Sequence, residues 1–125
     1  MVIDDEPLLR EVMQMMLEDF GYAVQIAKDG SEAVQIFAGS PEFSIVFIDF
    51  SMPIINGFDV YNELRQINPE TKFVIMSGLH KVPQLMNLGD QSDLVFLHKP
   101  FSEQQLLSAI SRVATLPKPT NLTAR

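Results

Sequence analysis

The chain contains no cysteine among its 125 residues, which excludes disulfide bonds, thiolate catalysis and zinc sites with cysteine ligands. It also has no apolar run of the length needed to cross a bilayer. Met1 is not followed by the pattern of a secretory signal peptide. We therefore expect one soluble domain in the cytoplasm.

Basic residues are few, with 9 lysines and arginines against 16 acidic residues and a net charge of -7. They are scattered singly, whereas a surface that binds nucleic acid needs clusters of them to neutralise phosphates. We expect no direct binding to nucleic acid or to a membrane. An acidic balance suits a solvated surface or a pocket of carboxylates that takes up a cation.

The most informative stretch is the apolar run Ile45–Asp49, which ends in a carboxylate. A short run without polar alternation is typical of a strand covered on both faces, as in a parallel sheet. Such a strand does not hold an unpaired Asp in its middle, but it can hold one at its carboxyl end, where open α/β sheets bind ligands. Asp49 is therefore the first candidate site residue.

Apolar runs and helical spacings alternate along the rest of the chain. Pro7 suits the first turn of a helix that Gly21 ends, Ser31 can cap the next helix, and Ser102 with Gln105 forms a capping-box pattern. The pattern predicts an α/β fold, a doubly wound five-stranded parallel sheet with helices on both faces. The predicted strands are residues 1–3, 22–27, 43–49, 73–76 and 94–97, and the predicted helices are residues 7–20, 31–37, 60–67 and 102–113.

Two segments are less regular. Pro83 interrupts residues 79–93, where only Leu85, Met86 and Leu88 suggest a short helix. Residues 116–125 carry two prolines and have the composition of a tail or linker. We expect one domain over residues 1–115, followed by this tail.

Polar side chains follow four of the predicted strands. Asp4 and Asp5 come after the first, Asp49 after the third, Ser77 after the fourth and Lys99 after the fifth. The carboxyl ends of parallel strands lie on one edge of the sheet, so these groups should meet in one crevice. Carboxylates without histidine or cysteine favour Mg²⁺, with Mn²⁺ as the alternative. The simpler alternative is that the first acids only cap the first helix.

Five motifs in this order resemble the response-regulator receiver domains of two-component signalling, in the CheY-like superfamily. The resemblance covers almost the whole chain and implies the strand order 2-1-3-4-5. The motifs are Val2–Pro7, Ala27–Ala33, Asp49–Pro53 with Gly57, Ser77-Gly78 and Lys99–Phe101.

The resemblance implies a role for each of these groups. Asp49 would be the phosphoacceptor, phosphorylated by a kinase's phosphohistidine. Asp5 would bind Mg²⁺ directly and Asp4 partly through water, with the Ser51 backbone carbonyl as a further ligand beside Asp49. Lys99 and Ser77 would contact the phosphoryl oxygens. The domain would catalyse only its own phosphorylation and dephosphorylation.

The resemblance also implies a switch. Ser77 would move toward the phosphoryl group and Phe96 would rotate inward. This would change an output surface formed by the fourth helix (within residues 79–93), the fifth strand and the fifth helix (residues 102–113). The bond from Lys99 to Pro100 would be cis. The expected partners are a sensor histidine kinase or phosphotransfer protein, and a downstream effector protein or an effector domain outside this chain; a homodimer stays open.

Three other functions are weighed against this interpretation. A phosphatase similar to the haloacid dehalogenases would need a second Asp where Ser51 stands. A flavodoxin-like flavin binder would need a phosphate-binding loop where Asp4 and Asp5 stand. A degenerate receiver would act only as a scaffold. His80 and His98 are expected to be surface or edge residues rather than ligands.

Overall fold

A five-stranded parallel sheet is the middle layer of the computed structural model, which describes residues 1–39, 43–50, 57–78 and 94–115. The strand order is β2-β1-β3-β4-β5, which confirms the predicted fold class and topology. The elements are β1 (Val2–Ile3), α1 (Pro7–Asp19), β2 (Ile26–Ala27), α2 (Gly30–Gly39), β3 (Ile45–Asp49), α3 (Gly57–Ile67), β4 (Lys72–Ser77), β5 (Leu94–His98) and α5 (Glu103–Ala114).

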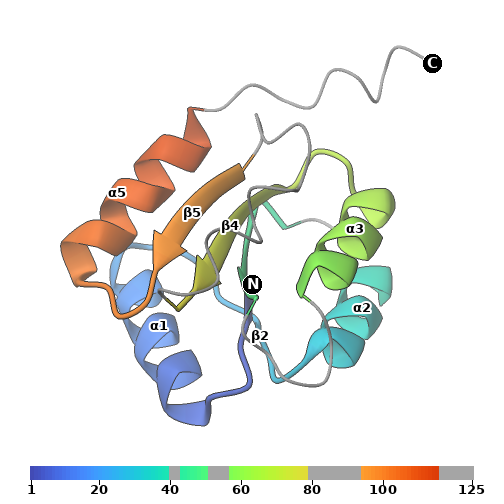
Figure 1. Cartoon of the computed structure of the whole chain (residues 1–125), viewed down its shortest axis with the longest axis horizontal. Helices are drawn as coiled ribbons and strands as arrows, with labels where there is room; N and C mark the ends of the chain where they lie inside the picture. The colour runs from blue at the N-terminus through green and yellow to red at the C-terminus, as the bar shows by residue number, and fades with distance from the viewer. Residues whose placement is uncertain (40–42, 51–56, 79–93, 116–125) are drawn as a thin grey trace.

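Helices cover both faces of the sheet, α1 and α5 on one face and α2 and α3 on the other (Figure 1). Along β3, Phe47 packs in the core on the side of α1 and α5, while Val46 and Ile48 pack in the core on the side of α2 and α3. Because both faces are buried, the strand is apolar at every position before Asp49.

The register of the sheet aligns the ends of three strands. Asp49 pairs with Met76, and Ser77 pairs with His98. Two backbone bonds continue these ladders, from Phe50 N to Met76 O and from Lys99 N to Ser77 O, each 2.8 Å long. The backbone pairing therefore places Asp49, Ser77 and Lys99 at one edge of the sheet.

The ends of the helices follow their sequence signals, with one correction. Pro7 begins α1, and the stop at Gly21 has a φ of 97°, a conformation that favours glycine. Ser102 and Gln105 form the predicted capping box. The predicted cap at Ser31 is wrong, because α2 begins at Gly30 and the Asp29 carboxylate accepts the Glu32 N–H at 2.9 Å. A carboxylate one residue before the helix reaches this N–H, whereas Ser31 is already inside the first turn.

The second strand is shorter than predicted, because β2 comprises only Ile26 and Ala27 of the predicted strand 22–27. Its neighbour β1 offers only Val2 and Ile3 as partners, and a strand extends only as far as its ladder. The predicted helix near Leu85 and the predicted tail at 116–125 lie outside the described residues. Among the described residues, no helix is both long and apolar enough to span a bilayer.

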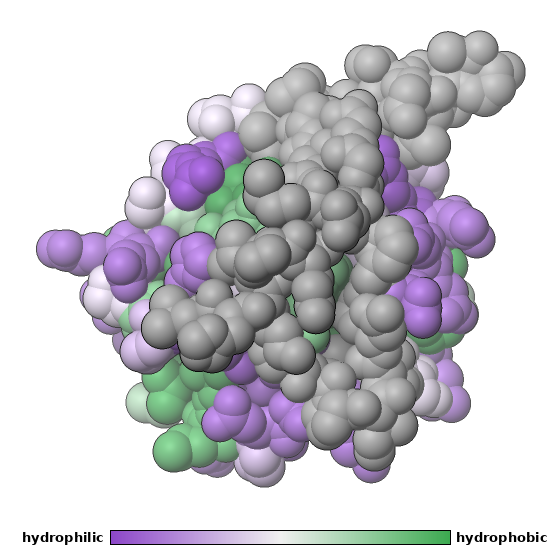
Figure 2. Space-filling view, viewed as in Figure 1, coloured by the Kyte–Doolittle hydropathy of each residue, from purple (hydrophilic) through white to green (hydrophobic). Residues whose placement is uncertain are grey.

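Helix α1 carries apolar side chains on its outer surface as well as on its packed face. Met13 and Leu17 of α1 are buried against the sheet, whereas Leu8 is 72% exposed and Met15 is 66% exposed. Figure 2 shows an apolar area at the lower left, where α1 lies in Figure 1. Helix α1 therefore presents apolar surface to solvent next to the loop that contains Asp4.

Candidate functional site

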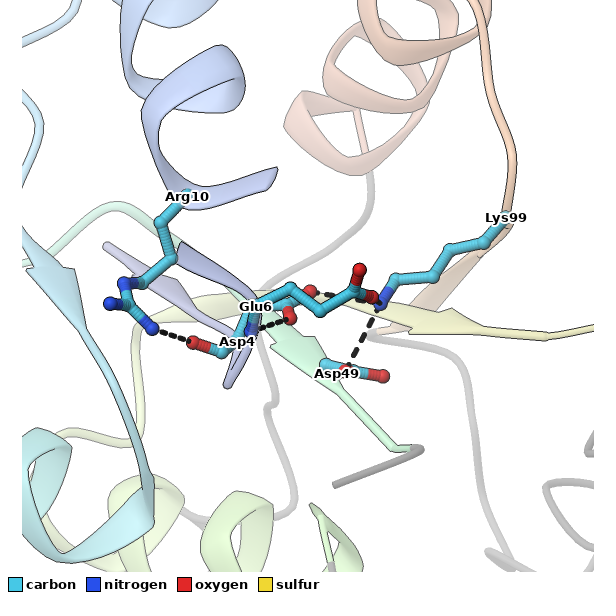
Figure 3. A network of polar contacts seen from close by, with 5 residues as sticks. All are labelled: Asp4, Glu6, Arg10, Asp49 and Lys99. Carbon is cyan, nitrogen blue, oxygen red and sulfur yellow. Dashed lines mark hydrogen bonds and ion pairs between the residues drawn. The ribbon is translucent and has the colours of Figure 1, made fainter. Parts of the chain in front are cut away.

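Three separate elements bring an ammonium and two carboxylates into contact at the carboxyl edge of the sheet (Figure 3). Asp4 follows β1, Asp49 ends β3 and Lys99 follows β5. The Lys99 Nζ atom lies 2.9 Å from Asp4 Oδ2, 3.0 Å from Asp49 Oδ2 and 3.6 Å from Glu6 Oε1. The predicted meeting of these groups is therefore observed.

The three charges lie in a largely buried place, because the exposed fraction of the side chain is 0% for Asp4, 2% for Asp49 and 16% for Lys99. Burial, together with the negative charge of Asp49, raises the pKa of Asp4 by more than the Glu6 N–H and the Lys99 ammonium lower it. Burial alone would lower the pKa of Lys99, but the close contact with Asp4 and the charge of Asp49 outweigh it, so that pKa is raised. Lys99 therefore stays an ammonium and supplies the positive charge that these buried carboxylates need.

The acids also have the chemistry of a divalent-cation site. One carboxylate oxygen each from Asp4, Asp5 and Asp49 lies within 4.8 Å of the others. Asp4 Oδ2 is buried and, despite the ammonium 2.9 Å away, accepts no hydrogen bond of good geometry from the described residues. Hard oxygens with an unsatisfied lone pair are suited to Mg²⁺ or Mn²⁺. The residues present therefore fit such an ion.

The other predicted site residues are only partly described. Ser77 ends β4 and is 2% exposed, and Phe96 is a half-buried residue of β5 against the core under α2 and α3. The Lys99–Pro100 peptide bond is cis. His98 is exposed. Ser51 and His80 lie outside the described residues.

Two residues that the sequence interpretation did not include also contact the site. The backbone N–H of Glu6 donates to Asp4 Oδ1 at 2.9 Å, and Glu6 is the third carboxylate near Lys99. Arg10 Nη1 donates to the backbone carbonyl of Asp4 at 2.7 Å. An Asp before a helix start does signal a local bond to the following backbone. No comparable signal predicts the contact of Arg10.

The comparisons with known proteins agree with this geometry. The sequence profile of the response regulator receiver domain matches residues 1–111. The chain belongs to this family. Receiver domains are signalling modules rather than conventional enzymes, and this chain is a receiver domain of the two-component signalling type.

Two relatives illustrate the range of proteins in which similar domains occur. The sensor kinase CckA of Brucella abortus is 32% identical over 114 residues, which are 90% of this chain and 12% of that kinase. The response regulator MprA of Mycobacterium avium is 28% identical over 119 residues, which are 95% of this chain and 52% of that protein. The receiver chain therefore spans about half of one relative and a small part of the other.

Solved receiver structures share the fold over most of their length. A response regulator receiver domain protein from Clostridium thermocellum has a TM-score of 0.78 at 28% identity, with 90% of each chain covered. The chemotaxis protein CheY4 of Vibrio cholerae has a TM-score of 0.76 at 26% identity, with 90% of this chain and 94% of that chain covered. The strand order of this receiver domain is thus the order expected for its family.

Proposed function

We propose that this receiver domain accepts a phosphoryl group on the side-chain oxygen of Asp49 in a Mg²⁺-dependent reaction. The donor would be a phosphohistidine of a sensor histidine kinase or a phosphotransfer protein. The observation that carries the proposal is the buried Asp49 carboxylate with Lys99 Nζ at 3.0 Å and the oxygens of Asp4 and Asp5 within 4.8 Å. This arrangement combines a nucleophile, a fixed cation and a set of ligands for a second cation.

The transfer forms one bond and breaks one. An Asp49 carboxylate oxygen bonds to phosphorus, the P–N bond to the donor imidazole breaks, and its electron pair stays on the imidazole nitrogen. Phosphoryl transfer depends mainly on positioning and on neutralisation of charge. The Lys99 ammonium neutralises one phosphoryl oxygen, and the Ser77 hydroxyl at the end of β4 donates a hydrogen bond to another.

Four groups of this chain would hold Mg²⁺, namely the carboxylates of Asp4, Asp5 and Asp49 and the backbone carbonyl of Ser51. When bound, the ion supplies positive charge to the transferring phosphoryl group. Asp5 is the exposed member of the three carboxylates, whereas Asp4 and Asp49 are buried. We therefore assign direct ligation to Asp5 and a partly water-mediated contact to Asp4, as the family resemblance implies.

Phosphorylation would then change the surface that partners contact. We assign the switch to Ser77 and Phe96, and the output surface to residues 79–93 together with β5 and α5. A population shift between two packings, stabilised by the phosphoryl contacts, would carry the signal to an effector protein or effector domain.

We assign the receiver domain to residues 1–115 and a tail to residues 116–125. We propose that the domain acts in the cytoplasm.

The decisive experiment is incubation with acetyl phosphate and Mg²⁺, read by intact mass. We expect an adduct of one phosphate that is absent in Asp49→Asn and without Mg²⁺. Asp59→Asn is the matched control, because Asp59 is exposed in the first turn of α3. Its adduct should equal that of the unmodified chain.

Other outcomes would replace the proposal. An adduct that persists in Asp49→Asn would move the acceptor to another residue. No adduct with any small-molecule donor would favour a receiver that acts only as a scaffold. Continuous turnover of a generic phosphate ester would favour a phosphatase, and a yellow flavin spectrum would favour a flavin binder.

A further inference from the structure

Each of the three oxygens of Asp4 has a donor or cation beside it, and three different places supply them. The backbone carbonyl accepts Arg10 Nη1 at 2.7 Å, Oδ1 accepts the Glu6 N–H at 2.9 Å, and Oδ2 lies 2.9 Å from Lys99 Nζ. Figure 3 shows Arg10 and Lys99 on opposite sides of the turn that contains Asp4. The turn is therefore held between two cations, and Arg10 contacts it at a backbone carbonyl.

Contacts with other described residues restrain the loop between β1 and α1 at few further points. The last ladder bond of β1 runs from Asp4 N to Ala27 O at 3.2 Å. Glu6, the N-cap residue of α1, makes no side-chain capping bond, and Pro7 has no N–H to donate. The guanidinium of Arg10, which also donates its own backbone N–H to Glu6 O at 3.1 Å, therefore ties the start of the helix to the end of the strand.

The bond to the Asp4 carbonyl also restricts the next residue. The Asp4 carbonyl and the Asp5 nitrogen belong to one planar peptide group, so fixing the direction of the carbonyl fixes the position of the Asp5 Cα atom. Asp5 is exposed, and its carboxylate has no hydrogen bond or ion pair with the described residues. The position of this carboxylate therefore depends on the backbone that Arg10 holds.

We propose that Arg10 is a positioning residue for the cation site, because it fixes the peptide plane between Asp4 and Asp5. The inference rests on the proposed function, in which these two acids and Asp49 hold Mg²⁺. The two possible roles of Arg10 predict opposite changes in Mg²⁺ affinity when its side chain is removed. As a mere positive charge near the site, Arg10 would weaken Mg²⁺ binding, so its removal would tighten binding. As a positioning residue it strengthens binding, so its removal must weaken it.

The test is calorimetric titration of Mg²⁺ into the unphosphorylated chain and three variants at constant ionic strength. Arg10→Met should bind Mg²⁺ about 10-fold more weakly, the lower end of the range for residues that orient metal ligands. Arg10→Lys keeps the charge without the planar guanidinium. Its affinity for Mg²⁺ should lie between those of the unmodified chain and Arg10→Met. Arg112→Met removes a charge from the exposed last turn of α5 and should bind as the unmodified chain does.

A second measurement separates positioning from general loss of stability. In EDTA, amide hydrogen exchange should become faster over residues 4–6 in Arg10→Met, while α5 exchanges as before. Should Arg10→Met fail to fold, the same Mg²⁺ titration of Arg10→Lys tests the positioning role.

The outcomes distinguish this inference from the proposed function. Binding in a folded Arg10 variant that is equal to or tighter than in the unmodified chain would overturn the role of Arg10 alone. An unmodified chain that does not bind Mg²⁺ would overturn the metal site, and the role of Arg10 with it. Weaker binding with unchanged exchange at residues 4–6 would also contradict the positioning role.

Discussion

Replacing Lys99 by methionine removes the ammonium between two buried carboxylates while keeping a side chain of similar length. Lys99 Nζ lies 2.9 Å from Asp4 Oδ2 and 3.0 Å from Asp49 Oδ2. Without it, and without a divalent ion, two negative charges remain next to each other in a place that water scarcely reaches. We expect the metal-free variant to be clearly less stable than the unmodified chain.

The magnitude follows from burial. Removing one partner of a buried ion pair destabilises a protein by about 3–5 kcal/mol. The lower end applies here, because Lys99 keeps a 16% exposed side chain and because Asp4, whose pKa burial already raises, can take up a proton. A loss of about 3 kcal/mol corresponds to a fall of about 10 °C in Tm for a domain of this size.

The assay is thermal unfolding followed by circular dichroism, first in EDTA and then with saturating Mg²⁺. The ion should restore more stability to Lys99→Met than to the unmodified chain, because the variant site is more negative and binds the cation more tightly. Tenfold tighter binding adds about 1.4 kcal/mol at saturation. Lys28→Met is the matched control, since Lys28 is exposed, and it should unfold like the unmodified chain.

Two results would refute this reasoning. An unchanged Tm of Lys99→Met in EDTA would show that the ammonium does not stabilise the buried carboxylates. An equal rise of Tm with Mg²⁺ in the variant and the unmodified chain would show that Lys99 and the divalent ion do not share a site.

A further prediction concerns stability away from the site. Ser102→Ala should lower the free energy of unfolding by about 1 kcal/mol, because it removes the side-chain acceptor of the capping box. Urea unfolding checks this, and Ser111→Ala on the exposed face of α5 should leave the free energy of unfolding nearly unchanged.

The periodicity of the sequence was sufficient to predict the layers of this fold. Continuous apolar runs ending in polar residues predicted strands buried on both faces, and parallel pairing then required Asp49, Ser77 and Lys99 to share an edge. The capping box at Ser102 and the stop at Gly21 were readable for the same reason, because each depends on bonds within a few residues.

Predictions failed where the length of a strand depends on its partner strand, or where the capping residue of a helix depends on the turn before it. Residues 22–25 have the composition of a strand but are not part of β2, because β1 provides only Val2 and Ile3 for pairing. Ser31 is a good cap by type, yet Asp29 is the residue placed to accept the Glu32 N–H.

Within the site, the sequence by itself predicted that Asp4, Asp49 and Lys99 meet, and the tertiary structure decided how deeply each acid is buried and which further residues contact it. Asp4 and Asp5 are adjacent and chemically identical, but the turn after β1 buries the first and exposes the second. The same turn brings Arg10 onto the Asp4 carbonyl and Glu6 toward Lys99. Sequence patterns report the period and the ends of elements, whereas these contacts depend on the path of the backbone between two elements, which forms only when strand and helix pack together.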